Sequence, residues 1–277
     1  MQVIRTRVFT AIWILCGAVT CVCPAALIAE TIKIGGTGVA LRTMQILGEA
    51  YEKYDPGNKI EIVRGLGSSG ARKALAAGAI DIAAISTSGN QSENVPEARV
   101  VKYGRSALVF ATRTTNPVSA ITTREIVDIW NGKTIKWPDG GRLRLILRPL
   151  SDSDTKVLKE ISAEMEQAVT NAHSRAGMKI AVTDHDSADM IQAVEGALGT
   201  SNLALIVAEN RALKPLSFNG VAPSAKTVAD GSYPLFKSLY LVSTPRFAGA
   251  SQKFIDFVVS SRNRHTLAQL GHAVEPK

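Results

Sequence analysis

The chain of 277 residues is 45% apolar and 20% charged, a composition that excludes a disordered chain, collagen and a multi-span membrane protein. At about 150 residues per domain, its length predicts one large or two small domains. Aromatic residues make up 5% of the chain and the 32 lysines and arginines are scattered, which disfavours nucleic-acid binding.

The first 29 residues have the layout of a secretory signal peptide. Arg5 and Arg7 form a basic start, residues 8–22 carry no charge, and small residues follow Pro24. The uncharged stretch is shorter than the ~18 residues that a membrane-spanning helix needs. We therefore expect export with cleavage just after Ala29 rather than a permanent anchor.

All the cysteines of the chain, Cys16, Cys21 and Cys23, fall inside this predicted signal peptide. The mature chain then has none, which excludes disulfides, thiolate nucleophiles and cysteine-ligated zinc in it. Two of the 32 basic residues and none of the 24 acidic residues lie in the same segment, so cleavage lowers the net charge from +8 to +6. Such a mild positive field is compatible with the capture of small anions.

From residue 31 onward, short apolar runs alternate with segments of helical periodicity. We expect strands at 32–34, 60–63 and 80–85, with helices at 39–54 and 71–77 between them. This order of strand, helix and strand implies a parallel sheet with right-handed crossovers.

The same patterns continue to the end of the chain. Further strands are expected at 107–112, 143–147, 180–182, 203–207 and 239–242, and further helices at 122–131, 155–161, 252–259 and 266–270. Thr122 or Thr123 caps the first of these helices and Gly132 ends it. Residues 114–117 are typical of a linker and residues 137–141 of a turn.

Three early loops, each directly after a strand, are rich in Gly, Ser and Thr and contain no acidic residue. They are residues 35–38, 65–70 and 86–90. In a parallel sheet such loops meet at the carboxyl ends of the strands, where hydroxyls and free helix N–H groups suit an oxyanion. One such loop is better explained as helix capping, but three in succession favour an anion site.

Residues 148–155 form a fourth candidate segment. Arg148 can grip an oxyanion with its forked guanidinium, and Ser153 and Thr155 at the start of a helix add further donors. On spacing alone, a helix cap beside a surface arginine explains this segment equally well.

Enzyme functions have less support. Residues 65–70 fit the dinucleotide pattern G-x-G-x-x-G, but no acidic residue follows at the spacing that a ribose needs. Leu66 stands where a nucleophile elbow needs its first glycine. We interpret residues 184–186, an Asp-His-Asp run, as a solvated loop rather than a metal site. The remaining histidines, His173, His265 and His272, are interpreted as surface residues.

Six stretches together resemble a known family. They are residues 35–38, 67–70, 80–82, 121–137, 148–155 and 220–235. In these stretches the chain resembles the phosphate-type solute-binding proteins of ABC transporters, which have the type II periplasmic-binding-protein fold. The resemblance spans nearly all of the mature chain. It is most specific in two stretches, the helix followed by Gly132-Lys133 and Trp137, and the segment from Gly220-Val221 to Pro234-Leu235.

The resemblance implies an α/β protein of two lobes, each a mainly parallel sheet flanked by helices, that close on an anion by hinge motion. We expect lobe I to comprise residues 30–112 and 220–277, and lobe II residues 113–219, with crossovers near 111–115 and 214–220. It also implies a monomeric, non-enzymatic periplasmic protein without cofactor or metal that delivers phosphate to an ABC permease. The alternatives are a sensor of the same fold and a binding protein for sulfate, molybdate, tungstate or an organic ligand. A dinucleotide-binding enzyme is the least favoured alternative.

The resemblance places ligand contacts in all four candidate loops. They are Thr37, Gly38, Val39, Ser68, Ser69, Ser86, Arg148, Ser153 and Thr155. Two positions depart from the family pattern. Ser86 stands where phosphate binders carry an aspartate that accepts the ligand's proton, and Asp154 stands where they carry a glycine. Either Asp154 takes over the acceptor role or the ligand is not phosphate, and we favour an Asp154 that faces away as a helix cap.

Overall fold

The computed structural model describes residues 30–89, 95, 97–245 and 248–274. The predicted signal peptide and the end of the loop expected at 86–90 lie outside these residues. The strands are β1 (Glu30–Gly36), β2 (Asn58–Val63), β3 (Ile82–Ser88), β4 (Arg99–Arg113), β5 (Ala120–Ile121), β6 (Arg144–Leu147), β7 (Lys179–Ile180), β8 (Ala197–Asn202), β9 (Leu213–Pro215), β10 (Ser217–Phe218), β11 (Phe236–Ser243) and β12 (His272–Ala273). The helices are α1 (Gly38–Tyr54), α2 (Gly67–Ala76), α3 (Thr123–Trp130), α4 (Ser153–Lys159), α5 (Ala163–Ser174), α6 (Asp184–Ala193), α7 (Leu203–Ala208), α8 (Ala225–Ala229), α9 (Ala248–Val258) and α10 (Arg264–Gln269).

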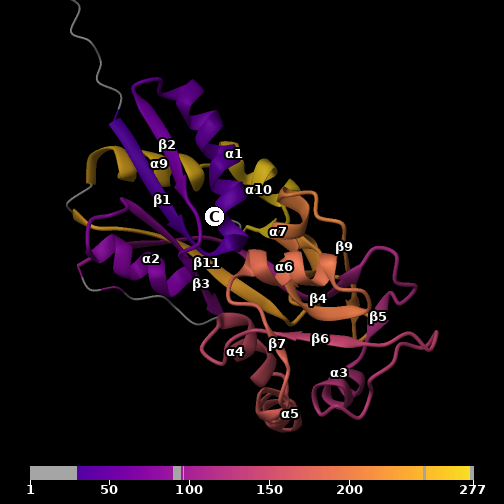
Figure 1. Cartoon of the computed structure of the whole chain (residues 1–277). Coiled ribbons are helices and arrows are strands. Elements are labelled where there is room, and N and C mark those ends of the chain that lie inside the picture. Colours follow the sequence, from indigo (N-terminus) through magenta and orange to yellow (C-terminus); the bar gives the residue numbers. More distant parts are fainter. Residues whose placement is uncertain (1–29, 90–94, 96, 246–247, 275–277) are drawn as a thin grey trace, which may run out of the picture.

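Within the described residues, one ten-stranded sheet runs through the molecule in the order β2-β1-β3-β11-β4-β8-β6-β7, with β9 and β12 also pairing with β4 (Figure 1). The sheet is parallel toward both ends, where β1 pairs with β2 and β3, and β6 pairs with β7 and β8. The long strand β4 and its neighbours β11 and β8 are antiparallel in the middle. Among these described residues, no helix combines the length and the apolar character needed to cross a membrane.

Helices cover both faces of the sheet in the first lobe. On one face Tyr51 of α1 and Phe254 of α9 pack on Ile34 and its neighbours, and their rings meet edge to face with centroids 5.3 Å apart. On the other face Leu75 of α2 packs on Ile85. Successive residues of a strand point to opposite faces of the sheet. In β3, Ile82 and Ala84 therefore pack on one face, and Ala83 and Ile85 pack on the other.

The second lobe has its own core around β6, β8 and helices α3 and α5. Trp130 ends α3 and is 1% exposed, and its ring meets Phe110 of β4 edge to face. The helix begins as predicted, because the Thr122 hydroxyl accepts from the Glu125 N–H while the Glu125 carboxylate accepts from the Thr122 N–H. The predicted two-lobed α/β architecture is confirmed.

Two segments expected to join the lobes lie side by side. The end of β4 pairs antiparallel with β9, so that Thr112 faces Lys214. The chain then returns to the first lobe, where the C-terminal helices lie beside the N-terminal strands (Figure 1). The residue limits of the lobes stay a prediction.

Two predicted elements differ from the structure. The apolar run at 203–207 was expected to be a strand, but it is helix α7, and the strand is β8 just before it. A short, fully buried apolar run is compatible with a strand and with a helix, so the spacing of apolar residues does not distinguish the two. The third candidate loop is also shorter than predicted, because β3 continues to Ser88 and pairs there with Lys237 of β11.

His272 is fully buried, so its interpretation as a surface residue is wrong, whereas His265 is exposed as expected. The His272 Nε2 lies 2.8 Å from the Thr43 hydroxyl, and the ring packs against Tyr103. Burial lowers the pKa of His272 to about 3 because a charged imidazole is poorly solvated there.

This burial predicts a loss of stability in acid. An unfolded chain protonates His272 near its ordinary pKa of about 6.5, whereas the folded state resists until about pH 3, so unfolding is favoured as the pH falls through this window. We expect His272 to account for about 3 kcal/mol of the stability lost between pH 7 and pH 4. In urea titrations, the free energy of unfolding of His272→Gln should fall by about 3 kcal/mol less than that of the wild type between pH 7 and pH 4. The control is His265→Gln, because His265 is exposed. Equal dependence in the His272→Gln variant and the wild type contradicts the assignment.

Candidate functional site

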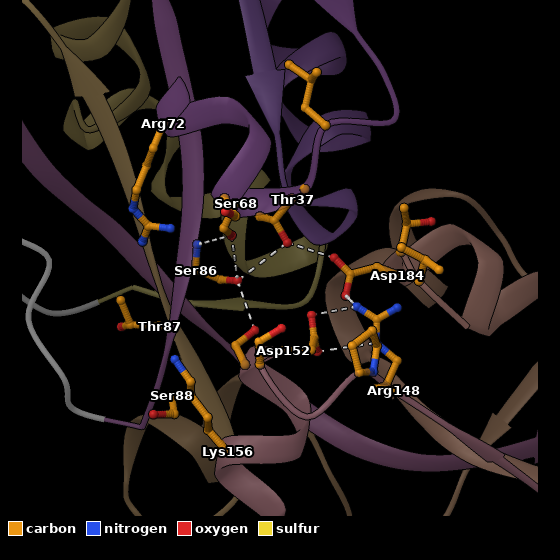
Figure 2. A pocket seen from close by; sticks show the side chains of 18 of the residues that line it. Thr37, Ser68, Arg72, Ser86, Thr87, Ser88, Arg148, Asp152, Lys156 and Asp184 are labelled. Carbon is orange, nitrogen blue, oxygen red and sulfur yellow. Dashed lines mark hydrogen bonds and ion pairs between the residues drawn. The ribbon is translucent and has the colours of Figure 1, made fainter. Parts of the chain in front are cut away.

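Hydroxyl groups from four separate segments form one connected network, which we call the hydroxyl cradle (Figure 2). Its members are Thr37, Ser68, Ser86 and Ser153. The Ser86 Oγ lies 3.4 Å from the Thr37 Oγ1, 3.3 Å from the Ser68 Oγ and 3.3 Å from the Ser153 Oγ. The structure therefore brings together one residue from each of the four candidate loops.

Local geometry explains why these hydroxyls meet. Thr37 is the N-cap of α1, Ser68 lies in the first turn of α2, and Ser153 begins α4. Ser86 lies within β3, and its backbone N–H donates to the Ser68 Oγ at 3.0 Å. Thr37, Ser68 and Ser153 stand where a helix begins after a strand, and Ser86 faces them from within β3, so the four hydroxyls point into the same space.

The hydroxyl cradle borders a cavity of about 420 Å³ that both lobes line. This volume is within the usual range for small-molecule sites. Of the predicted site residues, Thr37, Ser68, Ser69, Ser86, Arg148 and Ser153 line the cavity. Gly38, Val39 and Thr155 lie outside its lining, and the Thr155 hydroxyl instead donates to the Arg148 carbonyl oxygen at 3.3 Å.

Arg148 follows β6 and is buried at the cavity wall. Its Nε and Nη2 donate to the two carboxylate oxygens of Asp152 at 3.2 and 2.9 Å, and its Nη1 donates to the Ala181 carbonyl at 3.2 Å. Burial alone would lower the pKa of Arg148, but Asp184, Asp154 and Asp152 outweigh burial and raise it. The guanidinium is thus permanently charged and held in one orientation.

Five charged side chains form what we call the buried charge cluster: Arg148, Lys237, Asp152, Asp154 and Asp184. The Lys237 side chain is 0% exposed, and its Nζ lies 2.8 Å from the Asp154 Oδ1 and 3.3 Å from the Asp184 Oδ1. Burial alone would lower the pKa of Lys237, but Asp154 and Asp184 raise it instead. Two cations therefore face three carboxylates next to the hydroxyl cradle, and Arg148, Asp152 and Asp184 line the same cavity.

The structure corrects the prediction for Asp154. It does face away from the cavity, but it is not a helix cap. The cap of α4 is Asp152, whose carboxylate accepts from the Asp154 N–H. The Asp154 carboxylate accepts from the Thr200 hydroxyl at 2.8 Å and pairs with Lys237.

The interpretation of residues 184–186 as a solvated loop is wrong. These residues form the first turn of α6, with Thr183 as its N-cap and Asp186 completing a capping box. Asp184 lies on the cavity wall, and the His185 Nε2 lies 2.8 Å from the Glu209 carboxylate. The Thr-x-x-Asp spacing at 183–186 is a capping signal that could have predicted this helix.

Other residues on the cavity wall were not predicted as individual ligand contacts, although Thr87 and Ser88 belong to the third candidate loop. Arg72, Thr87, Ser88 and Lys156 line the side of the cavity away from Arg148 (Figure 2). The Ser88 hydroxyl donates to Glu160 at 3.0 Å. Half-buried His173, expected on the surface, lies with its Nε2 2.8 Å from the Arg148 carbonyl oxygen and so supports the chain behind the site.

A sequence model of the PBP superfamily domain matches residues 24–262. The chain belongs to the PBP superfamily. Among curated proteins, it is similar to the phosphate-binding protein PstS of Bacillus subtilis (strain 168), with 24% identity over 240 residues that cover 83% of this chain and 75% of the relative.

Solved structures share the fold of this PBP superfamily member. A protein from Clostridium perfringens, described as a phosphate ABC transporter substrate-binding protein and crystallised with bound phosphate, aligns with a TM-score of 0.72 and 20% identity. The alignment covers 90% of this chain and all of that one. An ABC-type phosphate transport receptor from Vibrio cholerae aligns with a TM-score of 0.61 and 18% identity over 88% of this chain and all of that one. The predicted type II periplasmic-binding-protein fold is confirmed.

Proposed function

We propose that the protein is a periplasmic, non-enzymatic solute-binding protein that captures phosphate between its lobes and delivers it to an ABC permease. The observation that carries the proposal is the hydroxyl cradle, because donors from both lobes converge with Arg148 on one cavity. The relatives described above, which are named for phosphate binding and transport, support the same ligand and the same kind of partner.

The proposed ligand contacts are the predicted residues that line the cavity: Thr37, Ser68, Ser69, Ser86, Arg148 and Ser153. Neutral hydroxyls and a buried guanidinium donate to oxyanion oxygens without needing to titrate. The wall also carries Asp152, whose pKa is raised by burial and by Asp154. A carboxylate there can accept a hydrogen bond from a protonated ligand oxygen, and it carries the negative charge that the neutral Ser86 hydroxyl lacks.

Calorimetry of the mature protein against phosphate, sulfate, molybdate and tungstate tests this function. We expect phosphate to bind with a Kd of about 1 μM or tighter, and sulfate at least about tenfold more weakly, since sulfate has no proton to offer Asp152. Phosphate binding should weaken from pH 5.5 to pH 8, because the ligand loses one of its two protons and gains a second negative charge beside the carboxylates of the cavity wall.

Three results would revise the proposal. Tight binding of sulfate, molybdate or tungstate in preference to phosphate changes the ligand and leaves the binding function in place. If none of the four anions binds at millimolar concentration, the protein does not have an oxyanion ligand. Turnover of a phosphate ester that is lost in Ser68→Ala, with binding intact, would favour an enzyme.

A further inference from the structure

The carboxylate of Asp184 sits where the sequence predicted contacts to an anionic ligand. Its Oδ2 accepts from the Thr37 hydroxyl at 2.7 Å and from the Val39 backbone N–H at 3.2 Å. The first N–H groups of a helix have no partner within the helix, and Thr37 makes no side-chain capping bond to α1. Asp184 therefore supplies the acceptor that α1, a helix of 17 residues, lacks.

The second oxygen of the same carboxylate faces the cations of the buried charge cluster. Its Oδ1 lies 3.4 Å from the Arg148 Nη2 and 3.3 Å from the Lys237 Nζ, and the Asp184 side chain is 4% exposed. Burial alone would raise the pKa of Asp184, but Lys237, Arg148 and the two bonds from the start of α1 outweigh burial and lower it. The carboxylate thus stays ionised with both oxygens bonded.

This contact joins the two lobes, because Asp184 begins α6 while Thr37 and Val39 belong to the first lobe. Gly38 makes the approach possible. A Cβ at Gly38 would lie 2.9 Å from the Asp184 Cβ and 2.8 Å from the His185 Nδ1, closer than real Cβ atoms come. Glycine at this position therefore lets α6 reach the start of α1.

We propose that Asp184 is an intramolecular anion that fills one subsite of the cleft and holds the lobes together before any ligand binds. The part that concerns the ligand rests on the proposed function. The entering oxyanion first meets Ser68, Ser86 and Ser153 in the cavity. Thr37, one of the ligand contacts proposed above, and the Val39 N–H donate to the ligand only after Asp184 withdraws from them. The fixed negative charge also repels a fully ionised ligand, so Asp184 sets the charge that the cleft accepts.

Asp184→Ala tests the ligand part of this proposal, with Asp186→Ala as the matched control. Asp186 is exposed and caps the same helix, so its loss removes one charge from α6 without changing the cavity wall. In calorimetry we expect Asp184→Ala to bind sulfate at least about tenfold more tightly than the wild type, a gain of about 1.4 kcal/mol. Asp186→Ala should match the wild type.

Small-angle X-ray scattering of the ligand-free proteins gives a readout that needs no ligand. We expect a larger radius of gyration for Asp184→Ala than for the wild type and Asp186→Ala. Gly38→Ala should expand the protein in the same way, because its Cβ blocks the contact without changing a charge. Asp184→Asn, which keeps the shape of the side chain, guards against misfolding and should fall between Asp184→Ala and the wild type in both measurements.

The outcomes separate this proposal from the proposed function. If the Asp184→Ala protein folds and has the sulfate affinity and the radius of gyration of the wild type, the proposal that Asp184 acts as an intramolecular anion is wrong. A wild type that binds no oxyanion, combined with an expanded Asp184→Ala variant, rejects the oxyanion function and supports the closing role of Asp184.

Discussion

Lys237→Met is expected to lower the free energy of unfolding by about 3–5 kcal/mol. The Lys237 Nζ is fully buried and lies within 3.3 Å of the carboxylates of Asp154 and Asp184. Methionine fills similar space but leaves both carboxylates buried with one cation fewer. Removing one partner of a buried ion pair costs much more than the intact pair contributes, because the remaining charge keeps its desolvation penalty.

Urea or thermal unfolding of the variant measures this effect, and Lys226→Met is the matched control. Lys226 pairs with Asp230 across one helical turn, but its side chain is 88% exposed. Exposed pairs of this kind contribute about 0.3–0.5 kcal/mol, so the control should unfold almost as the wild type does. A double variant that also carries Asp154→Asn should recover part of the loss. Equal stability of Lys237→Met and the control would mean that water reaches the buried charge cluster.

Arg148→Ala is expected to weaken phosphate binding at least tenfold, or by about 1.4 kcal/mol. The side chain lines the cavity, and its orientation is fixed by Asp152 and the Ala181 carbonyl. Its loss removes a charge-assisted donor from the site. It also leaves Lys237 as the one remaining cation of the cluster beside three carboxylates. The cavity becomes more negative, which weakens the binding of an anion.

Calorimetry at fixed pH and salt measures this loss, with Arg144→Ala as the control. Arg144 begins the same strand, but it donates to the Glu195 backbone and borders a different cavity. We expect the control to bind phosphate as the wild type does. Arg148→Lys keeps the positive charge but loses the planar pair of donors of the guanidinium. Its affinity for phosphate should therefore fall between that of Arg148→Ala and that of the wild type. If Arg148→Ala binds phosphate as tightly as the wild type, the guanidinium pairs with the carboxylates of the cluster and does not contact the ligand.

The hydroxyl cradle could be predicted from sequence because each of its parts is a local signal. Gly-rich turns between an apolar run and a helical pattern identify Thr37 and Ser68 without knowledge of the rest of the fold. The topology rule for parallel strands then places these turns at one edge. The position of Arg148 after a strand is also local, although spacing alone supported a surface arginine equally well, and the structure places Arg148 on the cavity wall.

The buried charge cluster could not be predicted in this way because it joins segments that are distant in sequence. Lys237 is 83 residues from Asp154 and 53 residues from Asp184. One clue was present, since Lys237 stands in a strand that is otherwise apolar or small, where an unpaired charge is not tolerated. The identity of its partners depends on β11 lying between β3 and β4, which local patterns do not reveal.

The position of β11 has a consequence for how the molecule folds. The sheet of the first lobe contains β1 to β3 from the start of the chain, but β3 is joined to β4 through a strand made of residues 236–243. Until this strand is in place, β3 presents an open edge that can pair with another chain. Pairings between such distant segments form slowly because a long loop must close first. A chain shortened before Phe236 should therefore aggregate rather than form a stable N-terminal lobe, and refolding should be limited by the insertion of β11.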